Sequence, residues 1–430
     1  MTVASARELV DRIWSRDPTV WTGGEEAQWL GWLDEPLRMR ERVDDLLSFA
    51  AESRPERVCL LGMGGSSLAP EVMRRAFGVG HFSVLDTTHP TAIRRVEATG
   101  TLFVASSKSG GTIETRSQLD HFRALGADAV VVTDPGSSME ELGLRVFHGE
   151  PTIGGRYSAL SIFGMLPAAL MGIDVLRLLE RAEEMREACR LDEGNPGLDL
   201  GLALGHGWQE GKDKLKTSGD FGLWVEQLVA ESTGKQGKGL VPVRTGDGDD
   251  VQEHEVRLAD PYELGQEFFR WEFATAVAGS VMELNPFDQP DVQAAKDKTT
   301  EVLGRGDDPP LEDEGDLDAV VRDARDGDYV AIQAFVDPER ERELEPIVER
   351  AGATGIPVAV GLGPRYLHST GQLHKGGPNS GIFVQVVDDL GDELPIPGRE
   401  FGFRRLIAAQ AAGDFEALRE RGRRVVRMHL

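Results

Sequence analysis

Hydroxyl side chains crowd residues 106–115, whose sequence is Ser-Ser-Lys-Ser-Gly-Gly-Thr-Ile-Glu-Thr. An apolar run at 102–105 precedes this segment and a helical pattern follows it, so it is a strand-to-helix turn. At such a turn, free backbone N–H groups meet the positive end of the helix dipole. A simple helix cap accounts for one hydroxyl but not for several. The segment therefore predicts a site for a phosphate or phosphate ester, formed by Ser107, Lys108, Ser109, Thr112 and Thr115.

A second glycine-rich turn lies at 62–70 and reads Gly-Met-Gly-Gly-Ser-Ser-Leu-Ala-Pro. It resembles a dinucleotide-binding fingerprint, and Asp86 stands where a ribose partner would. The fingerprint requires glycine at position 67, where this chain has Ser67. We therefore expect no nicotinamide cofactor, and expect Ser66 to bond to a sugar hydroxyl or a phosphate.

Composition limits the classes of function that the chain can serve. Its 430 residues carry a formal net charge of −26, which excludes nucleic-acid binding as the leading function and requires any phosphate site to be a local positive region. The only cysteines are Cys59 and Cys189, so we expect a reducing compartment and no metal cluster. The start of the chain does not read as a signal peptide, and no apolar run reaches about eighteen residues. These features predict a cytoplasmic protein.

The order of elements predicts an α/β fold. Buried strand patterns occur at 57–62, 81–86, 101–105 and 129–133, and again at 329–335, 357–361 and 381–387. Helical patterns separate them, which favours two successive doubly wound, mainly parallel units with flanking helices. We expect a helical segment at 1–48, a first domain at 49–190 and a second at 191–430. Residues 304–327 predict a solvated loop with a short helix, and the chain is expected to end in a helix and a basic tail.

Five motifs together resemble the glucose-6-phosphate isomerase family. They occupy 62–70, 107–115, 153–158, 231–235 and 285–296, in the order that the family has them. The resemblance is strongest to the isomerase half of transaldolase–isomerase fusion proteins, and extends to residues 366–377 and the C-terminal tail. It implies two sugar isomerase (SIS) domains, no cofactor and no metal. It also implies a cytoplasmic homodimer that acts in glycolysis and gluconeogenesis, with transaldolase as a possible functional partner.

The chemistry of aldose–ketose isomerisation explains why the family needs these residue types. A carboxylate must move a proton between two neighbouring carbons, and a buried carboxyl group has a pKa suited to this work. The resemblance implies that Glu231 is this base, although most glutamates simply lie on the surface. It also implies that Arg156 stabilises the enediolate, because a fixed guanidinium suits developing negative charge. Gly65 and Gly155 are expected to contact the substrate.

Closed sugar rings must be opened before a proton can move, and here the sequence departs from the family pattern. Lys296 stands at the position of the family's lysine, but the expected histidine segment before it is missing, and only His254 lies there. We expect His368 to act with Lys296 as the ring-opening acid, with His374 as its rival. A metal site at these two histidines is not expected, because no third ligand stands nearby.

Three other functions compete with a glucose-6-phosphate isomerase. A sugar-phosphate-binding protein without chemistry would keep the hydroxyl-rich loop, but it would not need Glu231, Arg156 and Lys296 together. An enzyme that also isomerises mannose 6-phosphate would need room that no sequence reveals. Transaldolase activity would need an eightfold β/α barrel, and the order of elements predicts none.

The net charge leads to a test in salt. If the acidity is an adaptation to a salty cytoplasm, mutual repulsion of the carboxylates is relieved by screening, since the Debye length falls from about 10 Å at 0.1 M to about 3 Å at 1 M. The melting temperature and the activity should then both rise with KCl. Indifference of both to KCl would contradict the hypothesis.

Overall fold

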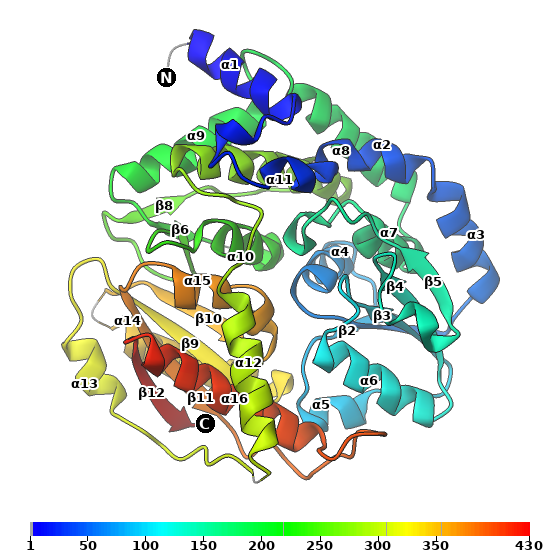
Figure 1. Ribbon diagram of the computed structural model, residues 1–430, viewed down its shortest axis with the longest axis vertical. Coiled ribbons are helices and arrows are strands. Elements are labelled where there is room, and N and C mark those ends of the chain that lie inside the picture. The colour runs from blue at the N-terminus through cyan, green and yellow to red at the C-terminus, as the bar shows by residue number, and fades with distance from the viewer. Residues whose placement is uncertain (1–2, 218, 307, 354) are drawn as a thin grey trace.

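Two parallel β-sheets carry the fold, and helices pack around them (Figure 1). The computed structural model describes residues 3–217, 219–306, 308–353 and 355–430. The first sheet has the strand order β2-β1-β3-β4-β5. Its strands are β1 (Arg57–Leu61), β2 (Phe82–Leu85), β3 (Thr101–Ser106), β4 (Asp128–Thr133) and β5 (Arg145–His148). The second has the order β10-β9-β11-β12, with β9 (Tyr329–Phe335), β10 (Val358–Leu362), β11 (Gly381–Val387) and β12 (Arg424–His429).

Helices cover both faces of the first sheet. Successive side chains of a strand point to opposite faces, so a strand that is apolar throughout must be buried on both. Val58 and Leu60 join one buried cluster, whereas Cys59 and Leu61 of the same strand join another. The first cluster includes residues of α4 (Leu68–Ala76) and α7 (Ile162–Leu170), and the second includes residues of α5 (Pro90–Arg95) and α6 (Ile113–Ala124). This is a doubly wound unit, as the sequence predicts.

The second sheet is built in the same way. Val330 and Ile332 pack with α13 (Leu317–Arg322) and α14 (Glu345–Gly352). Tyr329 and Ala331 lie on the other face, in a cluster that reaches α15 (Gly371–Gly376) and α16 (Phe403–Glu420). Helix α12 (Val292–Gly304) packs along α16 and faces the first unit (Figure 1). The expected α/β fold with two doubly wound parallel sheets is confirmed.

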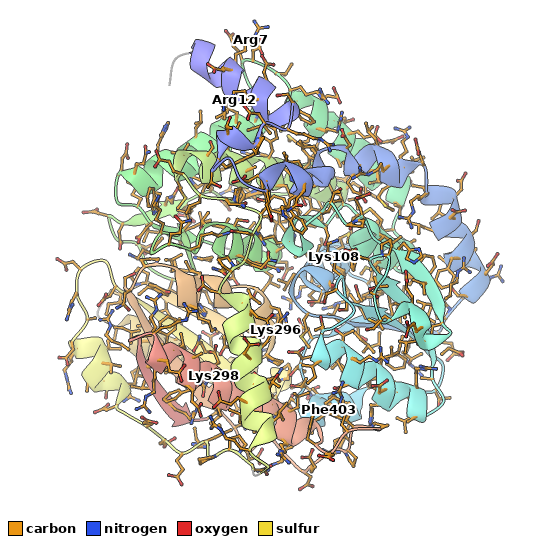
Figure 2. The ribbon with its side chains drawn as sticks, in the orientation of Figure 1. Arg7, Arg12, Lys108, Lys296, Lys298 and Phe403 are labelled. Atoms are coloured by element: carbon orange, nitrogen blue, oxygen red, sulfur yellow. The ribbon has the colours of Figure 1, made fainter. Side chains whose placement is uncertain are left out.

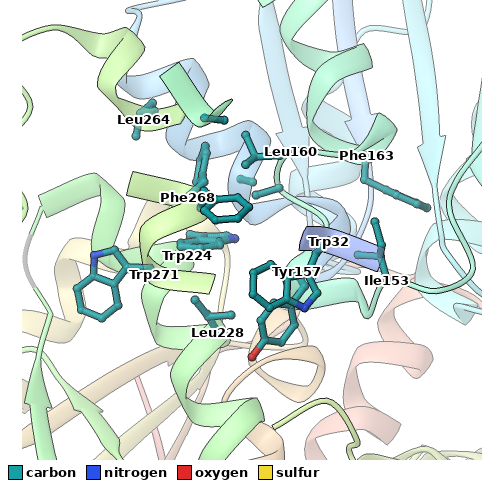
Figure 3. Close-up of a cluster of buried hydrophobic side chains, with 14 of the residues drawn as sticks. Trp32, Ile153, Tyr157, Leu160, Phe163, Trp224, Leu228, Leu264, Phe268 and Trp271 are labelled. Atoms are coloured by element: carbon teal, nitrogen blue, oxygen red, sulfur yellow. The ribbon is translucent and has the colours of Figure 1, made fainter. Parts of the chain in front are cut away.

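A layer of helices caps both units at the top of Figure 1. It contains α1 (Val3–Trp14), α2 (Glu35–Arg40), α8 (Val175–Ala188), α9 (Pro196–Gln209) and α11 (Leu264–Val281), with α10 (Gly219–Thr233) beneath it, whereas α3 (Val43–Ser53) lies on the flank of the first unit beside α7. Aromatic side chains hold the layer to the first unit and α10 to α11 (Figure 3): the rings of Trp32 and Tyr157 stack with centroids 5.4 Å apart, and those of Trp224 on α10 and Phe268 on α11 meet edge to face at 4.9 Å. One buried cluster thus includes residues from 10 to 287, while the expected domain boundaries at 48 and 190 stay predictions.

The structure contains strands that the sequence did not predict. A small parallel sheet has the order β7-β6-β8, with β6 (Lys214–Lys216), β7 (Val241–Val243) and β8 (Val251–Glu253). The residues expected to form a basic tail are instead strand β12, which pairs with β11 as the edge strand of the second sheet. One of its arginines does meet an acidic residue, since Arg424 Nη1 lies 2.6 Å from Asp328 Oδ2. Over the described ranges, no helix combines the length and apolarity that crossing a membrane requires.

A buried ion pair fastens α15 to α16 and leads to a stability prediction. Lys375 Nζ lies 2.5 Å from Asp414 Oδ1, and Tyr366 donates its hydroxyl to Asp414 Oδ2 at 2.7 Å. The side chains of the pair are 1% and 0% exposed. Lys375→Met would leave a buried carboxylate without its cation, so the free energy of unfolding should fall by about 3–5 kcal/mol. Denaturant titration measures this loss. Lys298→Met, which removes a surface ion pair, is the control and should have little effect.

Candidate active site

The hydroxyl-rich loop joins β3 to α6 and leaves the start of that helix open. Ser107 Oγ and Thr112 Oγ1 lie 2.8 Å apart and share a hydrogen bond. Thr112 is the N-cap residue, but its side chain makes no capping bond to the helix. Thr115 is fully buried, and its hydroxyl has no hydrogen-bond partner among the described residues. Helical N–H groups and hydroxyls therefore remain available to an anion at this end of α6.

Lys108 belongs to the same loop but already has partners. Its ammonium forms an ion pair with Asp134 and donates to the carbonyl of Glu150 at 2.9 Å. Burial lowers the pKa of Lys108, while the carboxylate of Asp134 opposes that shift. Figure 2 labels Lys108 and Lys296 on separate elements. A contribution of Lys108 to phosphate binding stays a prediction. Ser109 is exposed, and its Oγ accepts from the backbone N–H of Gly111.

The glycine turn after β1 brings distant segments together. A Cβ on Gly64 would lie 2.2 Å from the carbonyl oxygen of His368, and one on Gly65 would lie 2.2 Å from that of Gly155. Gly64 also has a φ of +53°, in the left-handed region that favours glycine. Ser66 follows in the same turn and is 8% exposed. The backbone of the glycine turn at Gly64 and Gly65 thus packs directly against the turns that carry Arg156 and His368.

Arg156 and Glu231 form a buried pair beside this turn. Arg156 Nη1 lies 3.2 Å from Glu231 Oε1 on α10, and the side chains are 1% and 11% exposed. Arg156 Nε donates to Ser232 Oγ at 2.8 Å, and Nη2 donates to the carbonyls of Pro286 and Asp288 at 2.6 and 3.0 Å. Nearly every donor of the guanidinium is fixed, so its charge is held at the carboxylate that the resemblance implies is the base.

His368 meets a carboxylate that the sequence analysis did not single out. His368 Nε2 lies 2.7 Å from Glu114 Oε1, on the first turn of α6. Burial alone would raise the pKa of Glu114, but the charge and the hydrogen bond of His368, together with the charge of Lys296, hold that pKa below its usual value. Gln410 of α16 donates to the same oxygen at 2.6 Å. Glu114 therefore stays ionised although it is 2% exposed.

One glutamine connects the two groups of residues. Gln227 Nε2 lies 2.9 Å from Glu231 Oε2 and 3.0 Å from the carbonyl oxygen of His368. Gln227 and Glu231 are four residues apart on α10, so they share a face of the helix. That spacing was visible in the sequence. The pairing of Glu114 with Gln410 was not visible in the sequence, because these residues are 296 positions apart.

A cavity of about 1150 Å³ opens between α6 and α12. Its lining includes three of the predicted site residues, Thr112, Lys296 and His368, and also Glu114 and Gln410. Among the residues described, Glu231 and Arg156 are not on this lining, and Glu231 is linked to the backbone of His368 through Gln227. Four basic side chains and three acidic ones line the cavity, whereas acidic residues outnumber basic ones by 73 to 47 in the whole chain. The cavity is therefore a locally positive region.

The other histidines occupy different surroundings. His374 is buried on the second sheet, where Gln333 Nε2 lies 3.0 Å from its Nδ1, and burial lowers its pKa well below the usual value. His254 lies 3.0 Å from Gln252. Of the histidines considered from the sequence, His368 is the one that lines the cavity with Lys296.

A pair of glycine substitutions tests the close approach of the backbone. Gly65→Ala should weaken the binding of a sugar phosphate and lower the melting temperature, because its Cβ would lie 2.2 Å from a carbonyl oxygen. Gly155→Ala should keep the melting temperature, since no described atom lies within 4 Å of a Cβ built there. Calorimetry measures both the binding of the sugar phosphate and the melting temperature. Equal melting temperatures of the two variants would contradict this account.

Comparisons with known proteins give the same answer as the motifs. No family model matches the chain. It is 37% identical over 210 residues to the glucose-6-phosphate isomerase of Gloeothece citriformis (strain PCC 7424), which covers 41% of this chain and 39% of the relative. It is also 37% identical over 268 residues to that of Thermosynechococcus vestitus (strain NIES-2133 / IAM M-273 / BP-1), covering 53% and 50%.

A solved structure shares the fold. The glucose-6-phosphate isomerase from Chlamydia trachomatis D/UW-3/Cx superposes with a TM-score of 0.57 and 17% identity, over 72% of this chain and 86% of that one. The chain spans about half the length, or less, of the curated relatives it matches. The resemblance to the glucose-6-phosphate isomerase family is thus confirmed over about half of this chain.

Proposed function

We propose that this protein is a cofactor-free aldose–ketose isomerase that interconverts glucose 6-phosphate and fructose 6-phosphate. The observation that carries the proposal is the buried pair of Glu231 and Arg156, 3.2 Å apart and joined through Gln227 to His368. A protein that only binds sugar phosphates needs an anion site but no buried base with a fixed cation. This arrangement therefore favours chemistry over binding alone.

The phosphate of the substrate would bind at the start of α6. Ser66, Ser107, Ser109, Thr112 and Thr115 supply hydroxyls, and the open N–H groups of the helix supply partial positive charge. Gly155 leaves room for the sugar to approach the backbone, and Gly65 lets the turn after β1 pack against it. The positive lining of the cavity draws the anion in, despite the acidic chain as a whole.

Ring opening would take place on the cavity side. His368 gives a proton to the ring oxygen as the bond between that oxygen and the anomeric carbon breaks, and the anomeric hydroxyl loses its proton to water. Glu114 holds His368 through Nε2, so Nδ1 is the nitrogen that can exchange a proton with the sugar. Lys296, on the same lining, supports the charge that develops.

Proton transfer would follow at Glu231. Its carboxylate takes the proton from C2 of the open aldose, the electron pair forms the enediolate, and the same proton returns to C1. Over the step the oxygen on C1 gains a proton and the oxygen on C2 loses one. Arg156 faces the negative charge of the enediolate, and its fixed hydrogen bonds spare it reorganisation during the step.

We also propose a cytoplasmic homodimer, with a separate transaldolase as a possible functional partner. These two points rest on the resemblance to isomerases and fusion proteins. The Glu114–His368 pair forms within one chain, which supports a ring-opening histidine from the same chain as Glu114. Analytical ultracentrifugation measures the oligomeric state.

Glu231→Gln tests the proposed function. The variant keeps the shape of the side chain but cannot accept the substrate proton, so kcat should fall by at least about 10²-fold, the lower range of what a positioned base contributes. A coupled assay with fructose 6-phosphate measures turnover, and calorimetry should show that fructose 6-phosphate still binds. Glu226→Gln, on the same helix and bonded only to Thr217 in the described chain, is the control and should retain activity. Full turnover by Glu231→Gln would remove this residue from the mechanism.

A further inference from the structure

Gln410 is buried in the wall of the cavity and belongs to α16, a helix to which the sequence assigned no part in the site. Its side chain is held at both ends. Gln410 Nε2 lies 2.6 Å from Glu114 Oε1, and Gln410 Oε1 lies 2.7 Å from the hydroxyl of Thr88. All three residues are at most 2% exposed, so water does not compete for these bonds.

The chemistry of the groups fixes the direction of each bond. An ionised carboxylate only accepts hydrogen bonds, so Gln410 must present its NH₂ group to Glu114. The amide oxygen then faces Thr88, whose hydroxyl donates to it. A reversed amide would set two acceptor oxygens against each other. The neutral amide is thus locked as a donor to the carboxylate.

The bonding of Glu114 is concentrated on a single oxygen. Oε1 accepts from both His368 and Gln410, whereas Oε2 is buried without a hydrogen-bond partner among the described residues. Glu114 therefore has two side-chain donors in this structure, and one of them is the histidine that it orients. Gln410 is the donor whose charge does not change when His368 exchanges a proton through Nδ1.

We propose that Gln410 is a positioning residue for ring opening, which fixes the carboxylate of Glu114 in place and so fixes the orientation and tautomer of His368. This inference rests on the proposed function, because ring opening matters only for a cyclic sugar phosphate. It assigns α16 a defined part. The amide of Gln410 on this helix bonds to Glu114 of α6, and Glu114 in turn bonds to His368 in the turn Arg365–His368.

Ring opening can be measured without isomerisation. Opening and closing of glucose 6-phosphate interconverts its α and β anomers, which NMR exchange spectroscopy detects. In the Glu231→Gln background isomerisation is blocked, so this exchange reports His368 and its supports alone. Gln410→Met, which keeps the length of the side chain and removes the donor, should slow enzyme-catalysed exchange at least about tenfold, within the 10²–10⁴-fold that a positioned acid contributes. The Kd of fructose 6-phosphate should stay within about twofold.

Gln385→Met is the matched control. Gln385 is also a buried glutamine; it lies on β11, donates to the carbonyl of Ala411 on α16 at 2.8 Å and accepts from Arg427 at 2.7 Å, but no bond to Glu114 or His368 is found among the described residues. Gln385→Met should destabilise the protein to about the same degree as Gln410→Met, but it should leave anomer exchange unchanged. If Gln410→Met does not fold, Gln410→Glu keeps the shape, replaces the donor by an acceptor and should give the same loss.

A second measurement separates failure of this inference from failure of the proposed function. The imidazole ¹⁵N shifts of His368 report its tautomer without any turnover. A loss of the Nε2–H form in Gln410→Met, but not in Gln385→Met, supports positioning even if the wild type does not isomerise glucose 6-phosphate. Exchange within twofold of the Glu231→Gln parent, with an unchanged His368 tautomer, would overturn the role of Gln410 while the isomerase could stand.

Discussion

The functional site depends on a contact of backbone with backbone at Gly64 and Gly65. Hydrogen is the only side chain that fits at both positions, because a Cβ at either would lie 2.2 Å from a carbonyl oxygen. The two oxygens belong to Gly155 and His368, which are far apart in the sequence. The turn after β1, the turn before Arg156 and the turn that ends at His368 therefore meet at one place. The ion pairs and hydrogen bonds of the site extend outward from it.

Buried cations then give the site its rigidity. Arg156 donates to the carbonyls of Pro286 and Asp288, and Lys235 donates to those of Asn285 and Asp288 at 2.8 and 2.6 Å. Burial and the neighbouring charge of Arg156 lower the pKa of Lys235 to about 8. Removing two cations from water is costly unless their donors find partners. The carbonyls of one loop offset that cost, and the remaining Nη1 of Arg156 faces Glu231 and also donates to Gln289 Oε1 at 3.0 Å.

The sequence predicted the parts of the fold whose signal is local. The strands at the centre of each sheet are continuous apolar runs, as in β4 and β9, and were found within about two residues. Edge strand β12 was missed because three of its residues are Arg424, Arg427 and His429, which resemble a charged tail. Strands β6 to β8 have three residues each, too few to show a period. The grouping of Glu231 with Arg156, and of Lys296 with His368, followed from motifs rather than from periodicity.

The unpredicted part of the site consists of contacts across long sequence separations. His368 and Glu114 are 254 positions apart, and only the packing of the second unit against α6 joins them. Gln227 shows what this packing achieves. Its amide nitrogen donates both to the carboxylate of Glu231 and to the carbonyl of His368, at 2.9 and 3.0 Å. A displacement of α10 would therefore move the base and the histidine together. One side chain thus links the proposed base to the backbone of the proposed ring-opening histidine, although the two residues come from α10 and from the turn Arg365–His368.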